Sequence, residues 1–210
     1  MDLKEAQLIT GGLSKTSKMP GPSFSISASK CKVGAKLREV KGSVCEGCYA
    51  LKGHYVYPVV KEAHARRLEG LDNPLWIEAI VALINASGTG WHRWHDSGDL
   101  QSLAHLEKIA EVCRLTPKVK HWLPTREYAF VQAYHAKHGS FPRNLTVRLS
   151  AYMIDGPLPL ALAKRLKVTV SGVTRDKEAV TCNAYKQGGV CGDCRLCWNP
   201  RKMEVMYPKH

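Results

Sequence analysis

The stretch WHRWHDSGDLQSLAHLEKIAEVCRLTPKVKHWL, residues 91–123, decides the fold. Its pattern predicts a strand over residues 91–96, a helix over 102–115 and a second strand over 119–123. A strand, a helix and a strand at this spacing form a parallel βα unit. The same rhythm continues in both directions along the chain, so we expect an α/β protein.

Neighbouring segments repeat this unit. Further strands are expected at 23–27, 145–150 and 168–173, and further helices at 56–70, 75–86, 127–138 and 158–166. Strands that alternate with helices in this way predict a partial or irregular parallel βα barrel, similar to a TIM barrel, with cysteine-rich loops that bind metal. The alternative is an open, doubly wound sheet.

The predicted strands carry polar residues at every second position. In LTVRLS, residues 145–150, Leu and Val alternate with Thr, Arg and Ser. Strands of a parallel sheet that is covered on both faces are normally apolar throughout. One face of this sheet is therefore expected to pack on helices. The other lines a lumen that holds water or a polar ligand, or else is a solvated face.

Length and charge set the broad class. The chain has 210 residues, and its formal net charge is +13. We expect an amino-terminal arm or loop over residues 1–22 and a single α/β domain over residues 23–210. The excess of Lys and Arg favours anionic partners, either small anionic molecules or nucleic acid. No apolar run approaches the ~20 residues that span a bilayer, and no secretory signal is recognisable, so we expect a cytoplasmic protein without a membrane partner.

A cysteine group lies near the carboxyl end, within the segment 182–198. The run CNAYKQGGVCGDCRLC has the spacing C-x8-C-x2-C-x2-C and contains Cys182, Cys191, Cys194 and Cys197. In a reducing cytoplasm, grouped cysteines indicate metal binding rather than disulfides. Four thiolates suit a 4Fe-4S cluster or a tetrahedral zinc ion, and the C-x2-C-x2-C run is more typical of iron–sulfur proteins. We therefore expect a 4Fe-4S cluster here, with zinc as the alternative.

A second, incomplete cysteine group consists of Cys31, Cys45 and Cys48. Three thiolates could hold a 4Fe-4S cluster with one open iron, or a zinc ion whose fourth ligand is His54. Alternatively, Cys45 and Cys48 could share one centre with the carboxy-terminal cysteines. Cys113 stands apart, because its helical spacing from apolar residues predicts a place in the core.

Polar residues gather where the predicted strand at 91–96 ends, in the run His95-Asp96-Ser97-Gly98-Asp99. Ligand sites of α/β folds lie at the carboxyl ends of strands. His95 could transfer a proton or bind a metal, and Asp96 and Asp99 could accept hydrogen bonds from an amine or a ribose. Gly98 allows a close approach of the backbone. The alternative is that Asp99 caps the next helix and that His95 packs in the core.

Two arginines complete the candidate site. Arg126 follows the next strand and could clamp a carboxylate or phosphate, or else it is an exposed residue at a helix start. Arg148 lies within a strand on the polar face, where it needs an anionic ligand or a salt-bridge partner. The expected catalytic residues are His95, Asp96, Asp99 and Arg148, and the expected cofactor-binding residues are Ser97, Gly98 and Arg126.

The motifs resemble those of one family. KMPGPSFS at 18–25, CEGCYALKGHY at 45–55, HDSGD at 95–99 and the closing cysteine group are together similar to the gene product 88 family of bacteriophage proteins. This resemblance covers residues 18–198. It implies a phage-encoded protein that acts in the cytoplasm of the infected host.

A looser resemblance is to radical S-adenosylmethionine enzymes. As in those enzymes, a three-cysteine set (Cys31, Cys45 and Cys48) follows the first strand, and Ser97-Gly98-Asp99 follows the second strand in place of a Gly-Gly-Glu-like motif. The spacing C-x13-C-x2-C differs from the C-x3-C-x2-C of that family. The resemblance implies a partial barrel, S-adenosylmethionine as cofactor and an auxiliary cluster at the carboxy-terminal cysteines.

These observations predict an iron–sulfur protein with one or two clusters and a redox or radical-type activity on a small anionic or nucleotide-like substrate. The alternative is a zinc-stapled protein that binds nucleic acid or a host protein and has no catalytic activity.

Overall fold

The computed structural model describes residues 1–209, which contain one sheet of six parallel strands. The strands are β1 (Ser23–Phe24), β2 (Trp91–Trp94), β3 (Lys120–Thr125), β4 (Leu145–Ser150), β5 (Thr169–Thr174) and β6 (Glu204–Pro208). Their order in the sheet is their order in the chain, and β1 and β6 are its two edges. A doubly wound sheet reverses its strand order at a switch point, and this sheet does not. The α/β class is therefore confirmed, and the unclosed sheet is consistent with a partial barrel.

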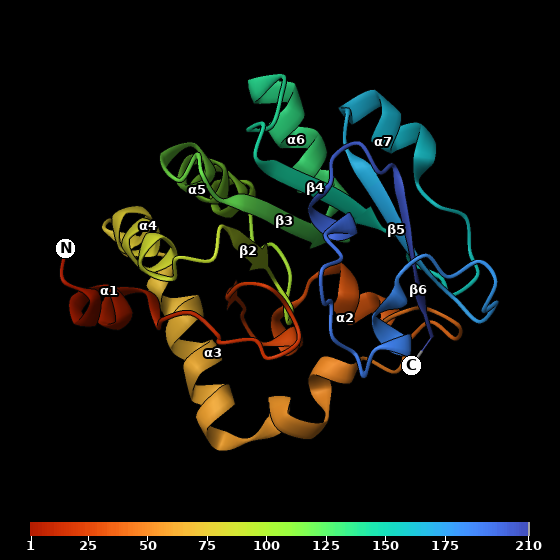
Figure 1. Cartoon of the computed structure of the whole chain (residues 1–210), viewed down its shortest axis with the longest axis horizontal. Coiled ribbons are helices and arrows are strands. Elements are labelled where there is room, and N and C mark those ends of the chain that lie inside the picture. Colours follow the sequence, from red (N-terminus) through yellow and green to blue (C-terminus); the bar gives the residue numbers. More distant parts are fainter. Residues whose placement is uncertain (210) are drawn as a thin grey trace.

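Helices separate most of the strands, and several of them cover one face of the sheet (Figure 1). They are α1 (Leu3–Thr10), α2 (Val33–Leu37), α3 (Pro58–Gly70), α4 (Trp76–Ala86), α5 (Leu103–Leu115), α6 (Tyr128–His138) and α7 (Leu160–Leu166). Single-turn helices are η1 (Ala28–Lys30), η2 (Tyr49–Leu51), η3 (Gly53–Val56), η4 (Asn183–Lys186) and η5 (Leu196–Trp198). Among the described residues, no helix combines the length and apolar character that crossing a membrane requires.

The main core lies between the sheet and helices α4 to α7. The apolar side chains of the alternating strands point into it, and Leu123, Val147 and Val170 are buried there. On β2, the ring of Trp94 packs against those of Phe24 and Trp76, at centroid distances of 6.1 and 6.3 Å. Cys113 of α5 is fully buried in this core, which confirms its predicted place.

The opposite, more polar face is covered by the carboxy-terminal cysteine segment. Trp198 of η5 packs on Trp122 of β3, with the ring centroids 5.1 Å apart. The Trp198 indole donates to the carbonyl of His92 at 2.8 Å, and the Thr146 hydroxyl donates to the carbonyl of Trp198 at 2.9 Å. The polar side chains of the strands therefore satisfy the backbone of a covering segment, and this face is not a solvated one.

The beginning of the chain differs from the expectation of a loop. Residues 3–10 form helix α1, whose first turn is capped by the Asp2 carboxylate. The helix packs on α4 through a small cluster that contains Ala6, Ala79 and Leu83. The interpretation of residues 1–22 as a loop or loosely held arm is thus wrong for the helical part, and the division of the chain at residue 22 stays a prediction.

The sheet also gains a strand that the sequence pattern did not predict. Strand β6 pairs with β5 in parallel, with Val205 opposite Ser171. Two backbone amides, those of Thr181 and Cys182, donate to the carbonyl of Met206 on β6 at 3.1 Å each. This strand therefore connects the carboxy-terminal cysteine segment to the edge of the sheet.

Candidate metal centres

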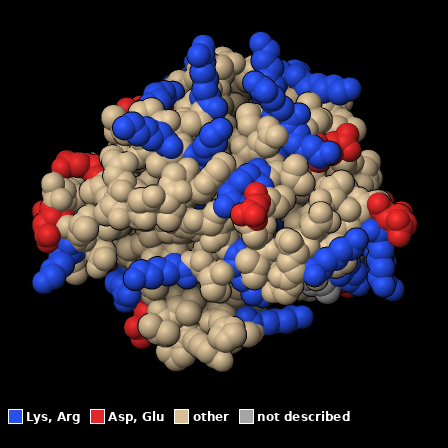
Figure 2. All heavy atoms as spheres, viewed as in Figure 1, with Lys and Arg blue, Asp and Glu red and all other residues tan. Residues whose placement is uncertain are grey.

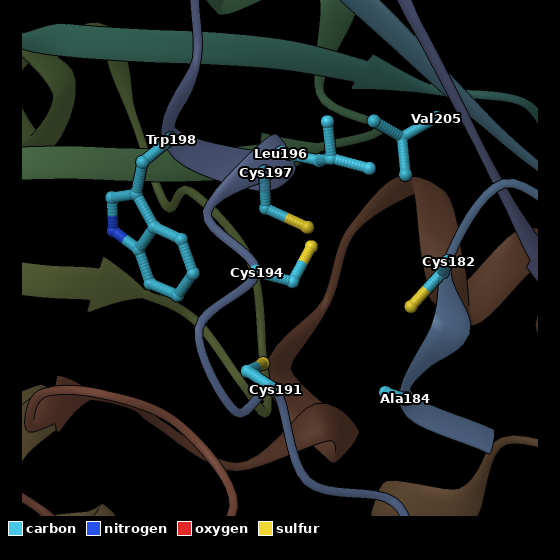
Figure 3. A pocket seen from close by; sticks show the side chains of 8 residues that line it. All are labelled: Cys182, Ala184, Cys191, Cys194, Leu196, Cys197, Trp198 and Val205. Carbon is cyan, nitrogen blue, oxygen red and sulfur yellow. The ribbon is translucent and has the colours of Figure 1, made fainter. Parts of the chain in front are cut away.

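The four carboxy-terminal cysteines surround one hollow. Cys182, Cys191, Cys194 and Cys197 line a hollow of about 20 Å³ together with Ala184, Leu196, Trp198 and Val205. The sulfurs of Cys194 and Cys197 point toward one another, and the sulfur of Cys182 points into the same space (Figure 3). All four predicted cysteines therefore border one hollow, in which two of the sulfurs approach each other, and metal binding by them stays a prediction.

Backbone contacts hold this loop in place. The amide of Cys191 donates to the carbonyl of Lys18 at 2.9 Å, and the amide of Cys194 donates to the carbonyl of Cys191 at 3.0 Å. Between these cysteines, Gly192 has a φ of 51°, in the left-handed region that residues with a Cβ rarely adopt. A glycine at this position allows the tight turn from Cys191 to Cys194.

Arg148 anchors the same segment from the sheet, although it was expected to meet an anion. Its guanidinium donates to five backbone carbonyls: those of Val170 (2.9 Å), Lys202 (3.2 Å), Met203 (3.3 Å), Leu196 (3.2 Å) and Asn199 (3.4 Å). Among the described residues no carboxylate pairs with it, so the salt-bridge alternative is wrong for residues 1–209. These contacts favour an anchoring role, and a catalytic role for Arg148 stays a prediction.

The most buried cysteine of this group has a polar neighbour. The Cys197 sulfur lies 3.0 Å from the Tyr207 hydroxyl on β6. Burial raises the pKa of the Cys197 thiol to about 11, while the hydrogen bond with Tyr207 and the charge of Arg148 act in the opposite direction. A bound metal displaces the thiol proton and offsets the cost of a buried thiolate.

The amino-terminal cysteines lie beyond the carboxyl end of β1. The sulfurs of Cys31 and Cys45 each lie 3.6 Å from the point where a Cβ on Gly34 would stand. Burial, reinforced by the nearby Asp99 carboxylate and by Cys48, raises the pKa of the Cys31 thiol to about 12. These two sulfurs therefore converge over Gly34, with Cys48 close enough to act on Cys31 electrostatically. His54, the candidate fourth ligand, packs its ring against that of Tyr57 at 5.2 Å.

Two carboxylates from the ends of β2 and β3 support this group. Asp99 accepts hydrogen bonds from the Thr125 hydroxyl at 2.6 Å and from the Arg126 amide at 2.9 Å. Glu127, which the sequence reasoning did not single out, accepts from the amides of Lys32 and Val33 at 3.1 and 2.8 Å. Glu127 thus fixes the chain directly after Cys31. Burial raises the pKa of Asp99 to about 6.

Arg126 lies beside the amino-terminal cysteines. Its Nε donates to the carbonyl of Ala151 at 3.2 Å, and its positive charge lowers the pKa of Cys45 against the larger effect of burial, which raises it. A guanidinium in this place can orient an anion at the carboxyl ends of the strands. This location agrees with the predicted binding role, which no other observation tests.

Asp96 connects the end of β2 to the loop that follows Cys48. It accepts hydrogen bonds from the hydroxyls of Ser23 (2.6 Å), Ser25 and Tyr55 (3.0 Å). Burial opposes its ionisation, but the charge of Arg93 and these three hydroxyls hold the pKa of Asp96 below its ordinary value. Asp96 is therefore an ionised carboxylate whose contacts are with the protein.

Ser97 and Gly98 lie against the chain that continues β1. The carbonyl of Ser97 accepts from the amide of Ile26 at 3.3 Å, and the buried Ser97 hydroxyl has no partner among the described residues. Gly98 has a φ of 79°, and a Cβ there would lie 2.7 Å from the carbonyl oxygen of Ile26. A glycine at position 98 is thus required by the packing of β2 on the segment after β1, and its predicted cofactor role stays untested.

His95 turns toward the helices. Its φ is 59°, and its ring lies 5.3 Å from that of His105 on α5. Burial lowers the pKa of His95 to about 3, so the imidazole is neutral. The structure favours the alternative that His95 packs in the core, and its catalytic role stays a prediction.

Arg93 is a partly buried cation that the sequence analysis did not single out. Its guanidinium stacks over the Trp122 ring at 4.4 Å and donates to the Met19 sulfur and to the His95 carbonyl, both at 3.4 Å. Its charge acts on Asp96 on one side and on Cys197 on the other. The alternating pattern of β2 places Arg93 on the polar face, and this was the signal that could have identified it.

The two cysteine groups differ from a compact site for one ion. Among residues 1–209, no group of three or more His, Cys, Asp or Glu side chains is arranged to hold a single metal ion. The carboxy-terminal cysteines line a hollow instead of meeting at one point. Their chemistry, four thiolates from one short segment, fits an iron–sulfur cluster or a zinc ion.

A comparison with known families identifies the chain. Residues 3–200 match the family model described as Gene product 88. No match was found among curated proteins or among solved structures. The matched range contains both cysteine groups and the first five strands. The chain therefore belongs to the gene product 88 family, the bacteriophage family that its motifs indicate.

Proposed function

We propose that the protein binds iron–sulfur clusters at its two cysteine groups and is a redox or radical-type enzyme that acts on a small anionic or nucleotide-like substrate. The observation that carries this proposal is the hollow lined by Cys182, Cys191, Cys194 and Cys197. Four cysteines grouped around one hollow in a reducing compartment favour binding of a metal or a metal cluster over disulfides.

The spacing of the cysteines favours a cluster over a single zinc ion. The run C-x2-C-x2-C at Cys191, Cys194 and Cys197 is more typical of iron–sulfur proteins, whereas structural zinc usually binds two separate C-x2-C pairs.

The amino-terminal group supplies three cysteines and is suited to a cluster with one open iron. Cys31, Cys45 and Cys48 lie where the loops after β1, β2 and β3 meet. Such a cluster, when bound, supplies one-electron chemistry. S-adenosylmethionine is the candidate cofactor at the open position, as the looser family resemblance implies.

Two residues beside this group, Arg126 and Asp99, could bind a substrate. Arg126 offers a guanidinium for a carboxylate or phosphate. Asp99, with a pKa of about 6, can hold or release a proton near neutral pH. The substrate would then be oriented by Arg126 at the carboxyl ends of the strands, the usual ligand site of βα barrels.

The test is anaerobic purification followed by determination of iron and acid-labile sulfide. We expect brown protein with absorbance near ~400 nm and a cluster signal in electron paramagnetic resonance after reduction. Cys45→Ser and Cys194→Ser should each remove part of the iron if there are two centres, and all of it if there is one shared centre. Cys113→Ser is the matched control, because Cys113 is buried in the core, and it should keep the full iron content.

Colourless protein with stoichiometric zinc in anaerobic preparations would contradict the proposal. It would favour the alternative of a zinc-stapled protein that binds nucleic acid or a host protein. The location in the host cytoplasm belongs to the same proposal, and fractionation of infected cells tests it.

A further inference from the structure

A strongly basic surface lies at the end of the sheet where strands β3 to β6 begin. Each of the segments that lead into β3, β4, β5 and β6 carries exposed cations. They are Lys118, Lys120, Arg143, Lys164, Arg165, Lys167, Arg201 and Lys202, and we call this set the basic rim. Because all strands are parallel, their amino ends lie together at this end of the sheet. Figure 2 shows Lys and Arg side chains gathered at the top of the molecule, over the region of α6 and α7.

The charges of the basic rim are not neutralised. The ion pairs among the described residues involve Arg114, Lys137, His138 and Arg175, and none includes a member of the rim. The four segments 116–120, 139–145, 163–168 and 199–204 contain one carboxylate, that of Glu204. The basic rim, even after the charge of Glu204 is subtracted, therefore accounts for more than half of the net charge of +13.

Stabilisation of helices explains only part of the rim. Lys164 and Arg165 lie in the last turn of α7, where a cation interacts favourably with the helix dipole. Lys118, Arg143 and Arg201, in contrast, lie outside any helix. The helix dipole falls off within one turn, so it gives no reason for these cations.

A hollow lies within the basic rim. It has a volume of about 180 Å³, and Arg143 and Lys167 lie on its wall with Phe141, Pro142, Leu166 and Pro200. Two cations on the wall of a partly apolar hollow can hold a phosphate while a sugar or a base contacts the apolar side chains.

The backbone beneath the hollow is firmly held. The Asn144 side chain donates to the carbonyls of Cys113, Thr116 and Val119 at 2.8, 3.1 and 2.9 Å, which ties the start of β4 to the end of α5. Lys167 has a φ of 54°, in the left-handed region that usually takes glycine. The backbone thus holds Arg143 and Lys167 in fixed positions. At position 167, a glycine would adopt the left-handed backbone angle more easily than the lysine that is present.

We propose that the basic rim binds the sugar–phosphate backbone of nucleic acid without regard to sequence. The cations follow one another along four neighbouring strands that are about 4.8 Å apart, which forms a linear array of positive charge. A polyanion with regularly spaced charges matches such an array. This proposal does not depend on the iron–sulfur proposal, because no residue of the rim is one of the cysteines or of the polar residues assigned to that site.

The test is fluorescence anisotropy of the full-length protein with a labelled DNA duplex of about 20 base pairs, at several salt concentrations between about 50 and 200 mM. The rim variant is Lys120→Gln, Arg143→Gln and Lys167→Asn combined. The control variant combines Lys4→Gln, Lys61→Gln and Lys177→Gln, which removes the same charge from exposed positions elsewhere. Circular dichroism and the urea concentration at half-unfolding show that each variant is folded as the unchanged protein is.

We expect the rim variant to bind at least about tenfold more weakly, and the slope of log K against log salt to fall by about 2 to 3. The control variant should bind within about twofold of the unchanged protein. If the combined rim variant does not fold, Arg143→Gln alone should still lower the slope by about 0.9.

Three outcomes would overturn the proposal. The first is the absence of DNA binding by the unchanged protein at the lowest salt. The second is an equal loss of affinity in the rim and control variants, which would indicate an effect of net charge alone. The third is displacement of the DNA by polyglutamate or anionic vesicles as readily as by unlabelled DNA, which would assign the surface to an acidic protein or a membrane.

Discussion

The Tyr207 hydroxyl lies 3.0 Å from the sulfur of Cys197, so strand β6 contacts the carboxy-terminal cysteine group directly. Burial raises the pKa of Tyr207 well above its ordinary value, so the phenol stays protonated and is the donor when Cys197 is a thiolate. Hydrogen bonds to the ligand sulfurs are one of the factors that set the reduction potential of an iron–sulfur cluster.

Replacement of Tyr207 by Phe tests this contact. We expect Tyr207→Phe to keep the iron content and to lower the reduction potential of the carboxy-terminal centre, because the reduced cluster loses a hydrogen bond. A redox titration followed by absorbance measures the change. Tyr185→Phe is the matched control, since Tyr185 is an exposed tyrosine of the cysteine segment 182–198. An equal shift of the reduction potential in both variants would contradict the role of Tyr207.

Arg148→Leu should destabilise the protein strongly. The variant leaves up to five carbonyls without their donor, and each unsatisfied buried group costs about 1–3 kcal/mol, so we expect a loss of about 3 kcal/mol or more in the free energy of unfolding. Urea denaturation measures it. Arg165→Leu, at an exposed position of α7, should change the stability by less than about 0.5 kcal/mol. If Arg148→Leu unfolds at the same urea concentration as the unchanged protein, the anchoring role is wrong.

Two glycines with similar backbone angles should respond differently to replacement by alanine. Gly98 has a φ of 79° and backbone of Ile26 at 2.7 Å from its prospective Cβ, whereas Gly88 has a φ of 65° and open space. Gly88→Ala should therefore cost only the left-handed penalty of about 1–2 kcal/mol. Gly98→Ala should cost clearly more, because backbone cannot move away as a flexible side chain can. Equal melting temperatures of the two variants would contradict the close packing at Gly98.

Buried histidines should make the protein unstable in mild acid. Burial lowers the pKa of His95 and of His121 to about 3, and these residues are therefore neutral in the folded state. The unfolded chain binds protons on them below its pKa of about 6.5, so the free energy of unfolding decreases as the pH falls from about 6.5 toward 3. Each group contributes up to about 1.4 kcal/mol per pH unit. Asp99 has its pKa raised to about 6, so between pH 6 and about 4 the folded protein binds a proton that the unfolded chain does not. This single group therefore opposes the destabilisation by the histidines in that range.

Denaturation in urea at pH 7, 6 and 5 measures this dependence. His121→Asn should reduce the slope of stability against pH, while His54→Gln, at an exposed position, should leave it unchanged. A slope that is the same in all three proteins would show that His121 is not a buried neutral imidazole.

The strand–helix rhythm from residue 91 to residue 174 could be predicted because its strands alternate regularly and its helices are long enough to show a periodic apolar face. Strand β6 could not, because it is an edge strand of five residues that ends in Pro208. Helix α1 was missed because its buried face consists of small residues such as Ala6, and its place depends on contact with α4.

The cysteine spacing predicted that the carboxy-terminal cysteines lie around one hollow, since they are close along the chain. The partners of that segment lie on strands β4 and β6, so no local pattern connects Cys197 with Tyr207 or Leu196 with Arg148. His95 was expected at the ligand site because it follows a strand. Its positive φ turned the ring toward α5, and such a backbone angle is not visible in the sequence.

The covering of the sheet by the cysteine segment has a consequence for biosynthesis. Ribosomes make strands β1 to β5 before residues 182–208, so a nascent chain displays Arg148 and Trp122 to water until the last strand emerges. If the cysteines bind the proposed cluster, closure of that face and capture of the cluster coincide in time. On that proposal, cells starved of iron would accumulate chains whose early portion is folded and whose final portion is a ready target for proteases.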